Sequence, residues 1–203
     1  MLVEKEHTVP DTYPLTLNAL VAGCNQKTSR DPVIEASEPE VQGAIDRLKS
    51  LSLVVESSGG RVMRYAQNAG KVIGVPPQSV AILAVLFLRG PQTAGELRIN
   101  TERLHRFSDI LSVQAFLEEL AARGAGAMVV ELPRAPGARE NRWAHHLSGA
   151  PDVAAAPANA PAADAIAVGE IAALKRNVDD LARELAEVKV ALARVMDELG
   201  IAR

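Results

Sequence analysis

Three polar residues close together, His105, Ser108 and Asp109, are of the types that form a nucleophilic triad. A working triad needs its base placed against the nucleophile and an oxyanion hole on the opposite side. Residues within one short helical segment rarely provide that arrangement, since they project from a single backbone. We therefore predict no hydrolytic centre at these positions.

Three further groups contain residue types used for phosphate binding, metal binding or thiol chemistry. Gly70-Lys71 lacks the glycine that a phosphate loop requires five positions earlier, because Tyr65 stands there. His145 and His146 are neighbours on an expected strand and point to opposite faces, which is poor geometry for one metal ion. Cys24 lies in an apolar helix and is most simply a small core residue. The sequence predicts a protein that is not an enzyme and has neither a cofactor nor a metal.

The composition favours a cytoplasmic protein. The chain has 203 residues and a single cysteine, which excludes a disulfide framework and fits a reducing compartment. Its longest apolar run, Val80 to Leu88, is far shorter than the ~20 residues that span a bilayer. We expect no membrane association, and the amino terminus shows no apolar signal region.

Charge is nearly balanced along the chain. Residues 1–75 contain 8 basic and 9 acidic side chains, residues 76–150 contain 8 and 7, and residues 151–203 contain 6 and 9. A strong, nonspecific nucleic-acid binder has a clear basic excess. Any contact with DNA must therefore come from local patches.

The carboxyl-terminal quarter divides into a linker and a helix. Residues 150–168 are rich in alanine and proline and offer no large side chain between Pro151 and Ala165, so they predict a linker. Residues 169–201 have the 3.5-residue apolar period of a coiled coil over about four heptads. The apolar residues that we expect to mediate oligomerisation are Ile171, Leu174, Val178, Leu181, Leu185, Val188, Leu192, Val195 and Leu199. The alternative is a lone amphipathic helix folded back on the body.

Before the linker, the sequence repeats itself. Val41-Gln42 with its following apolar residues matches Val113-Gln114, and each run begins near a serine suited to an N-cap, Ser37 or Ser112. The other matching segments, in the same order in both copies, are Pro14, Thr16 and Leu20 with Pro91, Thr93 and Leu97; Val54-Val55-Glu56 with Val129-Val130-Glu131; and Arg61, Arg64 and Tyr65 with Arg139, Arg142 and Trp143. Tandem duplication is the simplest account of this common order.

Each copy predicts two helices joined by a turn, followed by two short strands around a glycine-bearing tip. A helix-turn-helix followed by a hairpin is a winged helix. We therefore expect an α+β protein with one winged-helix domain over residues 1–74 and a second over residues 75–149. Residues 79–89 predict an apolar leading helix that packs against the neighbouring unit. Only Met1 to Asp11 correspond to it in the first unit, so we expect a truncated leading helix there. Either the natural start lies upstream of Met1, or the first unit buries its exposed face in another way.

Four blocks carry a family resemblance: YPLTLNALVAGCNQKTSRDPV from Tyr13, FLRGPQTAGEL from Phe87, RLHRFSD from Arg103 and LPRAPGARENR from Leu132. They resemble the YceH-like family of uncharacterised bacterial proteins, over essentially residues 3–149. The resemblance implies two tandem winged-helix domains and a helical carboxyl-terminal segment. It implies no biochemical activity.

Nucleic-acid binding is the function we expect first. In a winged helix, the second helix of the motif enters the major groove and the wing contacts phosphates or the minor groove. The candidate nucleic-acid-binding residues are Lys27, Arg30, Gln42, Arg47, Lys49, Arg61, Arg64, Arg134, Arg139 and Arg142. Among them, Gln42 and Arg47 suit base edges, and the other cations suit phosphates.

Two observations leave an alternative open. Glu38 and Asp46 in the first unit, and Glu118 and Glu119 in the second, would face phosphates at close range. The polar turn before the first of these helices could simply cap helix ends, and the wing arginines could be ordinary solvated charges. The alternative function is a non-enzymatic scaffold of tandem winged helices that binds other proteins. Either way we expect the chain to associate with itself through the coiled coil, with duplex DNA or protein partners bound by the body.

Overall fold

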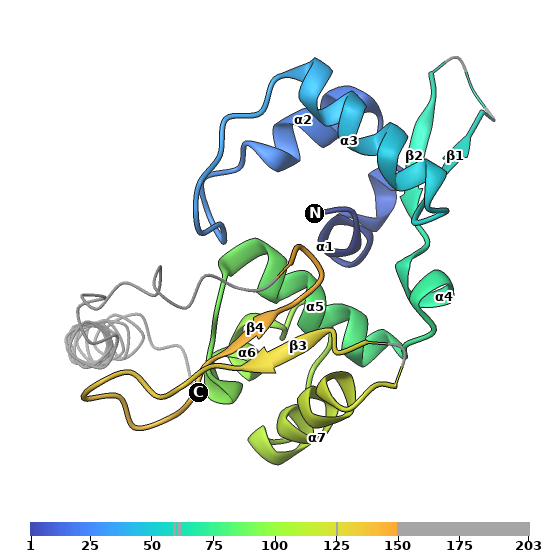
Figure 1. Cartoon of the computed structure of the whole chain (residues 1–203). Helices are drawn as coiled ribbons and strands as arrows, with labels where there is room; N and C mark the ends of the chain where they lie inside the picture. The colour runs from blue at the N-terminus through green and yellow to red at the C-terminus, as the bar shows by residue number, and fades with distance from the viewer. Residues whose placement is uncertain (59, 61, 125, 150–203) are drawn as a thin grey trace, which may run out of the picture. The chain divides into compact units, whose positions relative to one another are not determined.

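The computed structural model describes residues 1–58, 60, 62–124 and 126–149, which all belong to one compact unit of the chain. This part of the protein is mixed α+β, with two separate two-stranded antiparallel sheets (Figure 1). Arg61, the linker over residues 150–168 and the coiled coil over residues 169–201 lie outside the described residues. None of the helices in the described part has the length and apolarity needed to cross a membrane.

The elements fall into two consecutive series. The first series is α1 (Leu2–Thr8), the 3-10 helix η1 (Pro10–Thr12), α2 (Leu17–Cys24), α3 (Glu38–Ser50), β1 (Val54–Ser57) and β2 (Arg64–Gln67). The second series is α4 (Ala69–Ile73), α5 (Pro77–Arg89), α6 (Ala94–Asn100), α7 (Ile110–Ala121), β3 (Val129–Glu131) and β4 (Trp143–His145). Figure 1 shows them in order along the colour gradient, from blue at α1 to orange at β4.

The internal repeat is visible in the structure as the order α2, α3, β1, β2 followed by α6, α7, β3, β4. Hereafter these are the first and second repeats. In each repeat the second strand also pairs with the residue before the N-cap of the first helix, through the antiparallel bridges Leu15–Tyr65 and Gln92–Trp143. The first helix of each repeat is capped alike, because the Thr16 and Thr93 hydroxyls accept hydrogen bonds from backbone amides three residues later.

Each repeat contributes its own hydrophobic cluster. The first cluster contains Leu15, Leu20, Val41, Ile45, Val54 and Tyr65. The second, larger cluster is centred on α5 and α7 and includes Ile82, Leu86, Leu97, Leu117 and Trp143. Tyr65 and Trp143 hold equivalent places and are only 5% and 9% exposed, so each aromatic side chain completes the core of its own repeat.

Helix α5 is buried on nearly every side, as its uniformly apolar sequence predicts. Every residue from Ser79 to Leu86 is buried. Part of that cover comes from α1, which contacts α5 (Figure 1) and packs Val3 against the second cluster. On α1, Met1 and Leu2 pack against the first cluster, so this one helix joins the two.

The boundary of one helix differs from the sequence expectation. We expected the run in the second repeat to open at Ser112, and this is wrong, because α7 begins at Ile110. Asp109 is its N-cap, with Oδ1 accepting a hydrogen bond from the Ser112 backbone amide at 2.7 Å. In the first repeat the expected capping box is present, with the Glu40 carboxylate accepting from the Ser37 amide at 2.8 Å.

Candidate nucleic-acid interface

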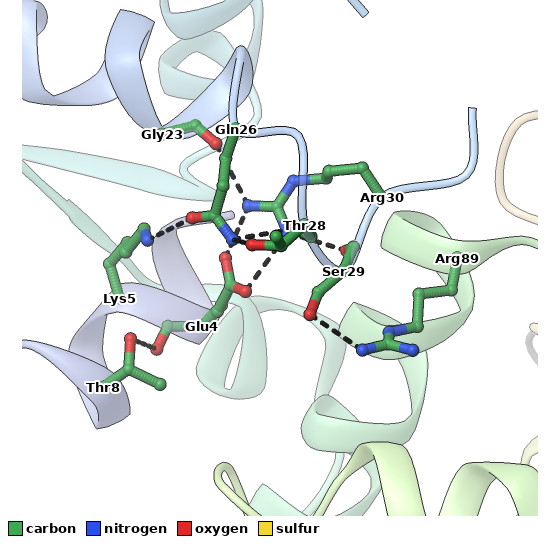
Figure 2. A network of polar contacts seen from close by, with 9 residues as sticks. All are labelled: Glu4, Lys5, Thr8, Gly23, Gln26, Thr28, Ser29, Arg30 and Arg89. Atoms are coloured by element: carbon green, nitrogen blue, oxygen red, sulfur yellow. Dashed lines mark hydrogen bonds and ion pairs between the residues drawn. The ribbon is translucent and has the colours of Figure 1, made fainter. Parts of the chain in front are cut away.

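The turn that connects α2 to α3 is held by a network of polar contacts with α1 (Figure 2). Arg30 donates to both oxygens of Glu4, at 2.6 and 3.2 Å, and also to the carbonyls of Gly23 and Ser29. The Arg30 and Glu4 side chains are 4% and 11% exposed, so this ion pair is buried. The Arg30 guanidinium is therefore used inside the protein and is not presented to a phosphate.

The ion pair with Arg30 changes the pKa of Glu4. Burial alone raises the pKa of a carboxyl group, but hydrogen bonds from Arg30 and its positive charge outweigh burial here. The pKa of Glu4 is consequently held below its ordinary value. Glu4 is ionised at neutral pH and ties α1 to the turn.

Hydrogen bonds of Gln26 order the rest of the turn. Lys5 donates to the Gln26 side chain at 2.7 Å, and the Gln26 amide donates to the Thr28 carbonyl at 2.8 Å (Figure 2). Lys27 lies between these residues, is exposed, and takes part in none of the hydrogen bonds found among the described residues. The turn thus presents Lys27 outward from a fixed backbone.

On α3, two of the three candidate side chains are engaged with neighbours. The Gln42 amide donates to Asp46 at 3.0 Å, one turn along the same helix. Lys49 forms an ion pair with Glu56 of β1, and that hydrogen bond raises the pKa of Lys49. Arg47 is exposed, and its guanidinium takes part in no hydrogen bond or ion pair among the residues that the structure describes. Arg47 is thus the candidate on α3 whose charged group stays exposed.

Arg64 and Arg142 are equivalent in the two repeats and make equivalent contacts. Arg64 donates to the carbonyls of Thr12 and Pro14, at 3.2 and 2.7 Å. Arg142 donates to the Pro91 carbonyl at 2.9 Å and pairs with Glu96 at 3.2 Å. Each arginine therefore fixes its hairpin to the segment just before the first helix of its own repeat.

The tip of the second hairpin carries the remaining candidates. Arg134 and Arg139 are both exposed, and a long contact of 3.5 Å from Arg134 to the Arg139 carbonyl places them near each other. Arg142 lies one residue before β4 and points to Pro91 and Glu96 instead. The structure thus brings Arg134 and Arg139 together, whereas Arg142 is held elsewhere.

Sequence reasoning missed three exposed arginines around the turn between α6 and α7, namely Arg98, Arg103 and Arg106. Arg98 lies near the N-terminal end of α7: hydrogen bonds from Ser112 are the main cause of the lowered pKa of Asp109, and the charge of Arg98 adds a smaller contribution. The internal repeat could have identified these arginines, because this turn is equivalent to the polar turn from Asn25 to Arg30 in the first repeat. Exposed apolar residues were also missed: Leu111 on α7 is 74% exposed, and Leu51 at the end of α3 is 60% exposed.

The residues with possible catalytic chemistry are occupied by structural contacts. Asp109 caps α7, and the Ser108 hydroxyl lies 2.9 Å from that of Ser112. His105 is packed edge-on against Phe107, and His145 is stacked on Phe87 with its ring centroid 4.0 Å away. Burial lowers the pKa of His145 and raises that of Cys24. Within the described residues there is no cluster of three potential metal ligands.

A family model described as "Protein of unknown function, DUF480" matches residues 1–138. The chain belongs to this family. Among its relatives are UPF0502 proteins of Burkholderia lata (57% identical over 202 residues, 99% of this chain and 86% of the relative) and Dechloromonas aromatica (59% over 191 residues, 94% and 89%). A third, from Methylibium petroleiphilum, is 58% identical over 202 residues, again 99% of this chain and 86% of the relative.

The matched DUF480 region includes both repeats up to the second hairpin tip, so it takes in α2 to α7 and β1 to β3. The resemblance to an uncharacterised bacterial family is thereby confirmed at family level. The names of these UPF0502 relatives state no ligand or activity, so the functional argument depends on the geometry of this chain.

Proposed function

We propose that this DUF480 protein is a non-enzymatic, cytoplasmic DNA-binding protein, most simply a transcriptional regulator, built from two tandem winged helices. The observation that supports this proposal is the twofold order of helix, turn, helix and antiparallel hairpin, α2 to β2 and α6 to β4. In that architecture α3 and α7 are the groove-facing helices and the hairpins are the wings.

Five of the cations that the protein leaves exposed make the contacts with DNA in this proposal. These are Lys27 and Arg47 in the first repeat, and Arg98, Arg134 and Arg139 in the second. Phosphate contacts fix register and affinity, whereas base contacts give selectivity. We assign phosphates to all of these residues except Arg47, which suits the O6 and N7 atoms of guanine.

The other sequence candidates have positioning roles in this proposal. Arg30, Lys49, Arg64 and Arg142 each bond a carboxylate or a backbone carbonyl of the same chain. Removing such a cation from its partners to reach a phosphate would exchange one interaction for another, with little net gain. They hold the turn, the end of α3 and the two hairpins where exposed cations can reach DNA.

Self-association belongs to the same proposal. The apolar period from Ile171 to Leu199 pairs two or more chains as a coiled coil. Two weakly binding bodies joined in this way gain avidity, because the second binding event becomes intramolecular. That gain suits a body whose charge is nearly balanced.

The test begins with selection of a preferred duplex from random sequences by the full chain, followed by titration of binding against salt. Arg139→Ala should reduce the slope of log K against log salt by about 0.9, since one phosphate contact is lost. Lys71→Ala is the matched control, because Lys71 is exposed on α4 and lies on neither a hairpin nor a groove-facing helix. The DNA proposal fails if no sequence is enriched and both variants bind bulk DNA as the parent does.

A second candidate function, a protein-interaction scaffold, is favoured by one specific observation. Leu111 on α7 is 74% exposed and Leu51, directly after α3, is 60% exposed, so both lie on or next to the helices that should enter DNA grooves. Glu118 and Glu119 add negative charge to the exposed face of α7. Exposed apolar residues of this size suit a protein surface better than a phosphate backbone. Failure of the DNA titration would leave this function as the better-supported one.

A further inference from the structure

A small cleft lies beside the Glu4–Arg30 network. Its volume is about 200 Å³, and it opens between α1 and the turn at Ser29 on one side and α5, α6 and the following turn on the other. Its polar lining includes Glu4, Ser29, Arg89, Glu102 and Arg103. This volume is below the 300–1,000 Å³ typical of pockets for drug-sized molecules, so the cleft suits a small ligand.

The charges around the cleft favour an anion. Arg89 donates to the Ser29 hydroxyl at 2.8 Å through one guanidinium nitrogen, which leaves its other N–H groups for a ligand (Figure 2). Arg103 is exposed, and its guanidinium takes part in no hydrogen bond among the described residues. Of the two carboxylates, Glu4 is neutralised by Arg30 and only Glu102 opposes the two arginines.

The remaining lining is largely aliphatic. Val85 is buried and Leu88 and Leu104 are half-buried, and these three aliphatic side chains form part of the wall of the cleft. Ile99 is 68% exposed, which is high for a large side chain beside a cleft. A ligand that covered Ile99 would remove this apolar surface from water, which favours binding.

The backbone of Ser29, which lines this cleft, has an uncommon conformation. Ser29 has φ of 59°, in the left-handed region that non-glycine residues seldom adopt. This conformation accompanies the contact between the Ser29 hydroxyl and Arg89. Residues in such sparsely populated conformations cluster at ligand sites, where contacts with the surrounding structure offset the conformational free energy that they cost.

We infer that this cleft binds a small monocarboxylate with a short aliphatic body. The carboxylate accepts hydrogen bonds from Arg89 and Arg103, since arginine matches carboxylate geometry. The aliphatic body lies on Ile99, Leu88 and Leu104. This binding site is independent of the proposed DNA contacts, because Arg89 and Arg103 are not among them.

The experiment measures binding of 4-methylpentanoate to the full chain by calorimetry, with the melting temperature as a second readout. The parent should show saturable binding and a rise in melting temperature. Three probes separate the ligand features: 4-methylpentan-1-ol lacks the charge, acetate lacks the aliphatic body, and inorganic phosphate tests for a general anion site. All three should bind more weakly than 4-methylpentanoate.

Arg103→Ala should weaken binding of 4-methylpentanoate by about tenfold or more, because a hydrogen bond to a charged group is lost. Arg106→Ala is the matched control, as Arg106 is an exposed arginine three residues further on that does not line the cleft. The melting temperature of each variant without ligand checks that it is folded. Absence of saturable binding, equal binding of the alcohol or of phosphate, or equal affinity of Arg103→Ala and the parent would overturn the inference.

Discussion

The buried pair of Glu4 and Arg30 is the side-chain contact on which the turn before α3 depends most. Two distances of 2.6 and 3.2 Å make it bidentate, and both side chains are nearly inaccessible to water. A buried pair of this kind contributes little compared with a well-packed apolar pair, but removing one partner leaves an uncompensated charge. The turn is therefore sensitive to the loss of either residue.

We predict that Glu4→Gln lowers the free energy of unfolding by about 3 kcal/mol, because Arg30 is left buried without a counter-charge. Denaturant unfolding at neutral pH measures this. Glu119→Gln, which removes an exposed carboxylate from α7, is the matched control and should cost little. A loss for Glu4→Gln no larger than for the control would contradict the buried-pair argument.

The same pair predicts a pH dependence. Because the folded-state pKa of Glu4 lies below its ordinary value of 4.5, Glu4 stabilises the fold above that value. This contribution falls as the pH drops from 4.5 through the lowered folded-state pKa, where the carboxylate becomes protonated. The Glu4→Gln variant should therefore lose less stability than the parent over that acid range, as unfolding curves at several pH values would show.

Among the elements, α5 contributes most to the second core. Its sequence is apolar on all sides, and the structure covers it with α1, α4, α6, α7 and β4. We predict that Leu86→Ala, at a side chain with 0% exposure, lowers the free energy of unfolding by about 3 kcal/mol. Leu111→Ala deletes the same atoms at a position that is 74% exposed, and denaturant unfolding should show almost no change. Similar losses for the two variants would argue against the burial of α5.

The helices and hairpins were predictable because their signals are local. Capping residues such as Thr16 and apolar runs such as that of α5 act within a few positions. The start of α7 was misjudged because Ser112 and Asp109 are both good N-caps, and Asp109 stands three residues earlier. The sequence contains both signals, and only the backbone geometry decides between them.

The contacts that the candidate site residues make were not predictable from the same local signals. Arg30 is 26 residues from Glu4, and Arg64 and Arg142 donate to carbonyls about 50 residues away. The local sequence around a basic loop residue does not show whether its side chain is solvated or donates hydrogen bonds to the backbone of another segment. Equivalence between the repeats is the one clue, because two arginines at matching positions indicate a shared structural contact.

At the scale of the whole molecule, charge balance limits how strongly one body can hold DNA. With 8 basic and 9 acidic residues in the first 75 positions and 8 and 7 in the next 75, counterion release can come only from the few exposed cations. Binding by one chain should then be weak. In the proposed function, association of chains through residues 169–201 raises the combined affinity for DNA.

Disruption of the expected coiled coil tests whether affinity for DNA depends on self-association. Leu181→Asp with Leu185→Asp places two charges at seam positions of the expected coiled coil, where each apolar side chain contributes roughly 1.5–3 kcal/mol when buried. Sedimentation should then give the monomer mass, and affinity for the selected duplex should fall by about 100-fold or more as avidity is lost. Ala186→Asp with Ala193→Asp adds the same charge at positions outside the apolar seam, and should keep both the parent mass and the parent affinity. An unchanged mass in the leucine variant would eliminate the coiled coil, whereas a monomer that binds DNA as tightly as the parent would show that one body is sufficient.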